Sequence, residues 1–154
     1  MIDIHEARAD DRAEILRVAQ SSGLFLSAEI PVFAQSFDAW CPGDPDEATL
    51  WLIAEGGGGA AMVTPEVMSD NVWNMLFIAV ARERQRQGIA SALLAAVEGR
   101  VAAVGGRMIL VDTADADDYV AARLFYGACG YQQVGRVPGY YGDDVARISF
   151  AKTL

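Results

Sequence analysis

A short basic turn with a glycine near its centre separates an apolar run from a helix-like segment in the middle of the chain. The apolar run, Val72–Val80, has the length and composition of a buried strand. The turn that follows it contains Gln85, Arg86, Gln87, Gly88, Ile89 and Ala90. Alanine, leucine and valine then recur at helical spacing over residues 90–104. We therefore predict a helix that begins directly after a buried strand.

A turn in this position can bind an anion. The first N–H groups of a helix have no partner within the helix, and the helix dipole places partial positive charge beside them. Gly88 lets the backbone approach a phosphate closely, and Arg82, Arg84 and Arg86 add positive charge. We interpret the turn as a phosphate-binding loop. The alternative is a solvated basic turn that only leads into a core helix.

The pattern of the turn resembles the acyl-CoA pyrophosphate loop of the GNAT N-acyltransferases. In that family the loop has Gln or Arg, two residues, Gly, one residue, and then Gly or Ala. Gln85, Gly88 and Ala90 match these positions, and the strand before them and the helix after them are the expected context.

A second segment resembles another GNAT signature, Ala-x-x-Phe-Tyr followed by Gly and an aromatic residue. It contains Ala122, Phe125, Tyr126, Gly130 and Tyr131. The two motifs stand in the family's order and spacing, and the resemblance covers nearly the whole chain. One position departs from the family, because Tyr119 stands where relatives often carry an asparagine that contacts the cofactor.

The length and the apolar content predict a single domain, residues 1–154, because 154 residues with 53% apolar side chains supply one full core. Predicted strands cover residues 2–6, 50–55, 60–64, 72–80, 108–113, 131–137 and 145–152. Predicted helices cover residues 13–20, 27–40, 86–104 and 117–129. Strands come first in hairpins and later alternate with helices. We therefore expect an α/β protein with a mixed central β-sheet and helices on both faces, and the resemblance implies the GNAT acyl-CoA N-acyltransferase fold.

Charge and composition exclude several classes of function. A net charge of −9 argues against nucleic acid as a partner and favours a cationic substrate. No apolar run reaches the length of a bilayer and the first residues do not form a signal peptide, so we expect a cytoplasmic protein with no membrane contact. Cys41 and Cys129 have no metal-ligand spacing and are expected to be free thiols, while His5 is expected to be structural. We expect no metal.

The resemblance implies transfer of an acetyl group from acetyl-CoA to a primary amine, with CoA as the other product. We expect a small-molecule acceptor, either an amino acid or a polyamine-like compound, that attacks the thioester directly in a ternary complex. Two alternatives stay open: acetylation of a protein N-terminus or lysine, and a CoA-binding domain without catalytic activity. A homodimer is possible.

The resemblance also assigns residues to acetyl-CoA. The expected cofactor-binding residues are Ile78, Ala79, Val80, Gln85, Arg86, Gln87, Gly88, Ile89, Ala90, Ser91, Tyr119 and Tyr126. The strand end at residues 77–80 would pair with pantetheine through its backbone, and an N–H there would polarise the thioester carbonyl. Tyr126 is the expected catalytic acid that gives a proton to the departing thiolate.

The general base and the acceptor pocket are less constrained. Asp112, at the end of a predicted strand, is the catalytic candidate for the base, with Glu29 or a chain of ordered water as alternatives. The residues expected to contact the acceptor are Glu29, Phe37, Trp40, Tyr140 and Tyr141. Proline and glycine in residues 136–144 predict a turn, in which two tyrosines and two aspartates would wall a pocket for an ammonium group. A plain hairpin loop with exposed aromatic residues is the alternative.

Overall fold

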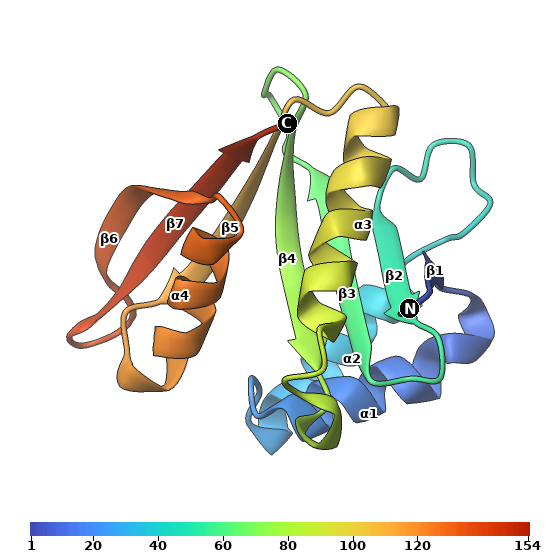
Figure 1. Cartoon of the computed structure of the whole chain (residues 1–154), viewed down its shortest axis with the longest axis horizontal. Helices are drawn as coiled ribbons and strands as arrows, with labels where there is room; N and C mark the ends of the chain where they lie inside the picture. Colours follow the sequence, from blue (N-terminus) through green and yellow to red (C-terminus); the bar gives the residue numbers. More distant parts are fainter. The chain divides into compact units, whose positions relative to one another are not determined.

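Seven strands and four α-helices follow one another along the chain in the computed structural model, which describes residues 1–154 (Figure 1). The strands are β1 (Ile4–Glu6), β2 (Leu50–Ala54), β3 (Gly59–Pro65), β4 (Val72–Val80), β5 (Met108–Ala114), β6 (Gln132–Gly142) and β7 (Val145–Thr153). The α-helices are α1 (Arg12–Ser22), α2 (Ile30–Asp38), α3 (Ile89–Ala103) and α4 (Val120–Ala128). The strand order is β1-β2-β3-β4-β5-β7-β6. Because β4 and β5 pair in parallel and β5, β7 and β6 pair antiparallel, the predicted mixed sheet is confirmed.

The chain divides into two compact units, which are described in turn. Unit 1 contains Met1–Thr64 and Phe77–Arg100. Unit 2 contains Pro65–Leu76 and Val101–Leu154. None of the helices in the structure combines the length and the apolar character that a membrane-spanning segment needs.

Unit 1 buries both faces of its strands. On one face α1 and α2 pack over aromatic side chains, with the ring centroids of Phe33 and Phe77 4.7 Å apart and those of Phe37 and Trp51 5.3 Å apart. On the other face lies α3, which approaches β3 at Gly59 so closely that a Cβ there would stand 2.5 Å from Ile89 Cγ2. The predicted helices on both faces are therefore present in this unit.

Unit 2 consists mainly of β5, β7 and β6 with α4 packed against one face. Parallel pairing joins Val72–Asn74 of β4 to Met108–Leu110 of β5, and β5 then pairs with β7 along its whole length. The ring of Tyr126 in α4 lies 5.8 Å from that of Phe150 in β7, which identifies the face that α4 covers. Side chains alternate along a strand, so Ser149 and its cross-strand partner Asp112 lie on the opposite face.

The turn predicted over residues 136–144 is wrong for most of its length. Strand β6 runs to Gly142, and only Asp143 and Asp144 form the turn to β7. β6 is the last strand of the sheet, where the missing N–H of Pro138 is tolerated, and the register with β7 shifts between Val137 and Gly142.

Three predicted helices also begin differently, and two of them do so in the same way. Each of these two opens with one turn of 3₁₀-helix, at Ser27–Glu29 before α2 and at Asp117–Tyr119 before α4. The predicted helix of residues 86–104 begins at Ile89, because Arg86 and Gly88 both have positive φ.

Candidate functional site

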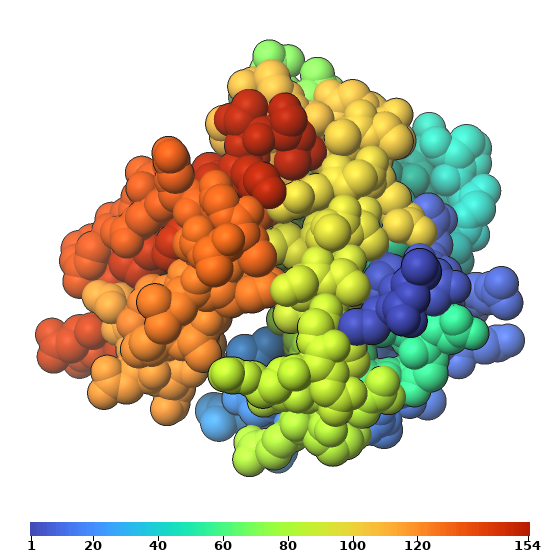
Figure 2. Space-filling model, in the orientation of Figure 1, coloured from blue at the N-terminus to red at the C-terminus, as the bar shows by residue number.

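The glycine turn of unit 1 presents the first N–H groups of α3 at the surface. Gly88 precedes the helix, and its carbonyl accepts the first helical hydrogen bond, from the N–H of Ala92 at 3.0 Å. The N–H groups of Ile89, Ala90 and Ser91 therefore have no acceptor within the helix. Residues 85–88 are exposed, and Figure 2 shows this part of the chain, in yellow-green, at the surface.

The backbone of the turn needs glycine at one position and is strained at another. Gly88 has a φ of 84°, which side-chain-bearing residues rarely adopt, and a Cβ there would meet only Ile2 Cδ1 at 3.7 Å. Arg86 has a φ of 64° although it carries a side chain. Such strained residues concentrate at binding sites, where the surrounding structure holds them. The donors, the open space and the absent Cβ fit an anionic group such as a diphosphate.

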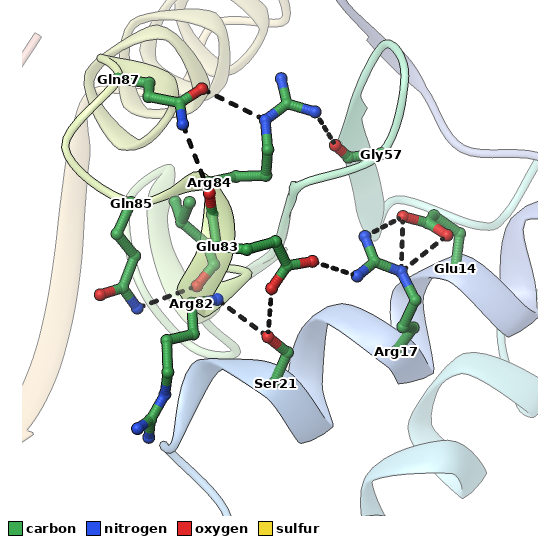
Figure 3. A network of polar contacts seen from close by, with 10 residues as sticks. Glu14, Arg17, Ser21, Gly57, Arg82, Glu83, Arg84, Gln85 and Gln87 are labelled. Atoms are coloured by element: carbon green, nitrogen blue, oxygen red, sulfur yellow. Dashed lines mark hydrogen bonds and ion pairs between the residues drawn. The ribbon is translucent and has the colours of Figure 1, made fainter.

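Side-chain hydrogen bonds hold the turn in this shape (Figure 3). Gln85 Nε2 donates to the carbonyl of Val80 at 3.2 Å, which ties the turn to the end of β4. Arg84 Nε donates to Gln87 Oε1 at 3.2 Å, and Gln87 Nε2 donates to the carbonyl of Glu83 at 3.4 Å. Gln85 and Gln87, both predicted to bind the cofactor, therefore already position the backbone of the turn.

A second set of contacts ties the turn to α1 (Figure 3). Arg17 Nη1 lies 2.5 Å from Glu83 Oε1, and its Nη2 lies 2.7 Å from Glu14 Oε1. Ser21 Oγ donates to Glu83 Oε2 at 2.9 Å and accepts from the N–H of Arg82 at 2.8 Å. This network connects residues more than 60 positions apart in the sequence, so the spacing of charges along the chain gives no signal for it.

In unit 2 the structure places Tyr126 in a buried aromatic environment. Only 6% of the residue is exposed, and its ring lies 6.0 Å from that of Tyr131 and 5.8 Å from that of Phe150. Burial, and to a lesser degree the neighbouring Cys129, raises the pKa of the phenol above its usual value. The hydroxyl therefore keeps its proton at neutral pH and can act as a hydrogen-bond donor.

Asp112, the predicted base, lies on the opposite face of the same strands from Tyr126. Its Oδ1 accepts a hydrogen bond from Ser149 Oγ at 2.5 Å and lies 3.9 Å from Arg147 Nε. Its role as a base stays a prediction.

The sequence of the chain matches a family model. The model, described as an acetyltransferase (GNAT) domain, matches residues 46–133, more than half of the 154 residues. This chain belongs to the GNAT acetyltransferase family. It is therefore an acetyl-CoA-dependent N-acetyltransferase, as the two sequence motifs implied.

Solved structures show the same fold. A protein from Desulfovibrio desulfuricans, described as an acetyltransferase of the GNAT family, superposes with a TM-score of 0.92 at 24% identity over 99% of both chains. An aminoglycoside 6′-N-acetyltransferase complexed with coenzyme A has a TM-score of 0.78 at 19% identity, over 98% of this chain and 96% of its own. The ribosomal-protein-S18-alanine N-acetyltransferase from Escherichia coli has a TM-score of 0.79 at 18% identity, over 99% of this chain and 94% of its own. The GNAT fold predicted from the sequence is confirmed. No curated protein sequence matches the chain.

The other predicted site residues of this GNAT acetyltransferase are divided between the two units. In unit 1, Ala79 is buried in the core, and Ile78 and Val80 alternate with it on β4 as half-buried residues. In unit 2, Tyr119 caps α4 and is half-buried. Their contacts with the cofactor stay predictions.

Three predicted acceptor contacts of the acetyltransferase lie on or beside α2 and have structural partners of their own. Glu29 Oε2 accepts from the N–H of Leu26 at 2.7 Å, which caps the start of the helix. Phe37 is 5% exposed within the core of unit 1. Trp40 Nε1 donates to the carbonyl of Thr49 at 3.0 Å. Their role in acceptor binding stays a prediction.

Tyr140 and Tyr141 contact each other and an arginine. Their ring centroids are 4.8 Å apart in an edge-to-face arrangement, and the guanidinium carbon of Arg147 lies 4.6 Å above the ring of Tyr140. The guanidinium of Arg147 therefore covers one face of the Tyr140 ring, and the role of the two tyrosines in acceptor binding stays a prediction. The aspartates of the turn line a separate open depression of about 640 Å³ with Arg136, Pro138, Gly139 and Ala146. No sequence pattern marks Arg147, because only the pairing of the strands brings it to Asp112 and Tyr140.

Replacement of Glu83 by glutamine tests the contacts that tie the turn before α3 to α1. A hydrogen bond from its own backbone, then those from Arg17 and Ser21, lower the pKa of Glu83 from 4.5 to about 2. Because the folded pKa lies below the unfolded one, this carboxylate stabilises the protein above pH 4.5 and the effect is lost as the pH falls toward 2. Glu83→Gln should therefore lower the free energy of unfolding at pH 7, and the difference from wild type should shrink below pH 4.5.

Urea unfolding of both proteins between pH 7 and pH 2 measures this difference. The same variant should weaken the affinity for CoA by less than about ten-fold, since the ion pair is exposed. Glu55→Gln, at an exposed carboxylate of the β2–β3 turn, is the matched control. A difference in stability that does not change with pH would contradict this role of Glu83.

Proposed function

We propose that this acetyltransferase moves the acetyl group of acetyl-CoA to the primary amine of a small molecule. The observation that carries the proposal is the exposed turn before α3, where Gly88 is followed by N–H groups that have no acceptor within the helix. The net charge of −9 favours acceptors that are cations in solution, as alkylamines are.

The turn supplies the donor side of the reaction. The N–H groups of Gly88, Ile89, Ala90 and Ser91 bind the diphosphate of acetyl-CoA, and Arg86 adds positive charge from an exposed position. By resemblance to the family, the backbone of Ile78–Val80 pairs with the pantetheine arm. Gln85 and Gln87 contribute by holding the backbone in place, through the hydrogen bonds that their amides make.

The chemical step is direct attack on the thioester. Acetyl-CoA supplies the acyl group and a thiolate leaving group. The neutral amine nitrogen forms a bond to the acyl carbon while the carbon–sulfur bond breaks, and the electron pair of that bond leaves on sulfur. Tyr126 is protonated at neutral pH, as phenols are, and burial raises its pKa further. Its hydroxyl donates a hydrogen bond to the thiolate, or gives it the proton and regains one from solvent after the step. The acceptor ammonium loses one proton before the attack, and the nitrogen loses a second proton as the amide forms.

Ordered water is the proposed route for that last proton. Glu29 already accepts a backbone N–H, and Asp112 already accepts the hydroxyl of Ser149. Because each carboxylate already has a hydrogen-bond donor of its own, we propose that the proton leaves through ordered water. The proximity of two substrates bound together supplies much of the acceleration.

An acceptor screen that follows release of free CoA tests the proposal. The panel contains amino acids, polyamines, aminoglycosides and peptides with free N-termini or lysines, each with acetyl-CoA. The proposal predicts turnover with at least one class of small amine and slower turnover with peptides. Turnover with peptides alone would make the chain a protein acetyltransferase instead. Binding of CoA in calorimetry without turnover on any amine would make it a CoA-binding domain without activity.

A further inference from the structure

Arg147 lies on the face of unit 2 opposite α4, among polar and aromatic side chains. It pairs across the sheet with Ala114 of β5, and it follows the alternation of β7 that also places Ser149 on this face. Tyr140 of β6 packs against its guanidinium, and the carboxylate of Asp112 lies 3.9 Å from its Nε. The proposed reaction gives this arginine no role.

The guanidinium of Arg147 lacks the hydrogen bonds that other arginines of unit 2 make. Arg107 donates to the carbonyl of Asp70 at 3.1 Å, and Arg123 donates to the carbonyl of Ala114 at 2.6 Å. Arg136 donates to Asp115 at 3.5 Å. Arg147 Nε, in contrast, is buried and has no hydrogen-bond partner. Asp112 compensates its charge only at a distance too long for a hydrogen bond.

Two contacts nevertheless orient the side chain of Arg147. The ring of Tyr140 covers one face of the guanidinium at 4.6 Å, which restricts its rotation. Ser149 fixes Asp112 through the 2.5 Å hydrogen bond. About 30% of the Arg147 side chain stays exposed, and with Nε buried this exposed part includes the end of the fork. A guanidinium oriented in this way, with an accessible edge, can bind a planar carboxylate, which accepts two parallel hydrogen bonds from its N–H groups.

We propose that Arg147 binds a carboxylate of the acceptor, so that the acceptor is an amine that also carries a carboxylate, such as an amino acid. This proposal rests on the proposed function and narrows it, since it selects amino acids over polyamines. Tyr141 packs edge-to-face against Tyr140 and is half-exposed, so its hydroxyl is a second hydrogen-bond donor on this part of β6.

Matched acceptors test the proposal with the wild-type enzyme. Each free amino acid is compared with its own amide, which has the same side chain and amine but no carboxylate charge. Each rate is divided by the fraction of the acceptor amine that is neutral, because the amine of an amino acid amide has a lower pKa than the amine of the free amino acid. We expect kcat/KM to favour the free acid by at least about ten-fold, the effect of one charge-assisted pair. Equal values for acid and amide would overturn the proposal.

Variants of Arg147 test whether this residue causes the preference for free acids over amides. Arg147→Gln should lower kcat/KM for the free acids by about 10–100-fold, mainly by raising their KM. The kcat/KM for the amides and the KM for acetyl-CoA should not change. Arg147→Lys keeps the charge without the fork and should restore part of the loss. Arg136→Gln, on the neighbouring strand, is the matched control and should behave as wild type. An equal loss for acids and amides in Arg147→Gln would show a structural role only.

A binding readout separates this proposal from the proposed function. The buried Arg147 Nε–H should give an NMR signal that shifts when a free amino acid is added and does not shift with its amide. A shift without turnover on any amine would retain the carboxylate site and reject the transferase proposal for these acceptors. Turnover without a shift and without preference for acids would reject the carboxylate site and retain the transferase.

Discussion

Gly88→Asp is expected to abolish the binding of coenzyme A, with a loss of affinity of at least about 100-fold. The aspartate would place a negative charge where the diphosphate meets the N–H groups of α3. It would also have to adopt the φ of 84° that glycine tolerates. Calorimetry with CoA measures the affinity, and circular dichroism checks that the variant is folded.

Two further variants separate charge at the turn from general effects. Gly43→Asp introduces the same residue at another glycine with positive φ, 90°, where a Cβ meets nothing within 4 Å, and it should leave CoA binding unchanged. Arg86→Ala should weaken binding less than Gly88→Asp, since the backbone provides most of the contact. Unchanged affinity in a folded Gly88→Asp variant would remove the turn from the acetyl-CoA site.

Tyr126→Phe should reduce the maximal rate by about 10²–10⁴, the range for a positioned acid, with little change in CoA affinity. Phenylalanine keeps the ring that packs against Tyr131 and Phe150 and removes only the hydroxyl. The loss should shrink with an acyl donor whose thiol is more acidic, because that thiolate leaves without a proton. Tyr131→Phe removes a hydroxyl from the neighbouring ring and should keep the rate.

Pre-steady-state measurement is needed to interpret this variant. If release of product limits the wild-type enzyme, the steady-state rate hides a slower chemical step. A rapid-quench experiment measures that step in a single turnover. An unchanged chemical step would make Tyr126 a packing residue, and water would then protonate the thiolate.

The sequence predicted the elements that depend on local patterns. The turn around Gly88 was predicted from the strand before it, the helix after it and the match to the GNAT motif, and the positive φ of Gly88 agrees with a turn at this position. The helix start was placed too early, at residue 86. Arg86 adopts a positive φ although it carries a side chain, and no propensity predicts such strain.

The hairpin of β6 and β7 shows where local patterns mislead. Pro138 and Gly139 predict a turn by composition, but β6 continues through them because it is an edge strand with irregular register. Long-range contacts were not predictable at all. Glu83 meets Arg17, and Arg147 meets Tyr140 and Asp112, only because the sheet and α1 bring them together.

Titration of the ¹⁵N-labelled acetyltransferase with CoA and, separately, with pantetheine tests the central claim most directly. CoA carries the diphosphate and pantetheine does not. The backbone N–H signals of Gly88, Ile89, Ala90 and Ser91 should shift strongly with CoA and remain in place with pantetheine. If CoA binds while these four signals do not move, the turn does not hold the diphosphate and acetyl-CoA binds elsewhere.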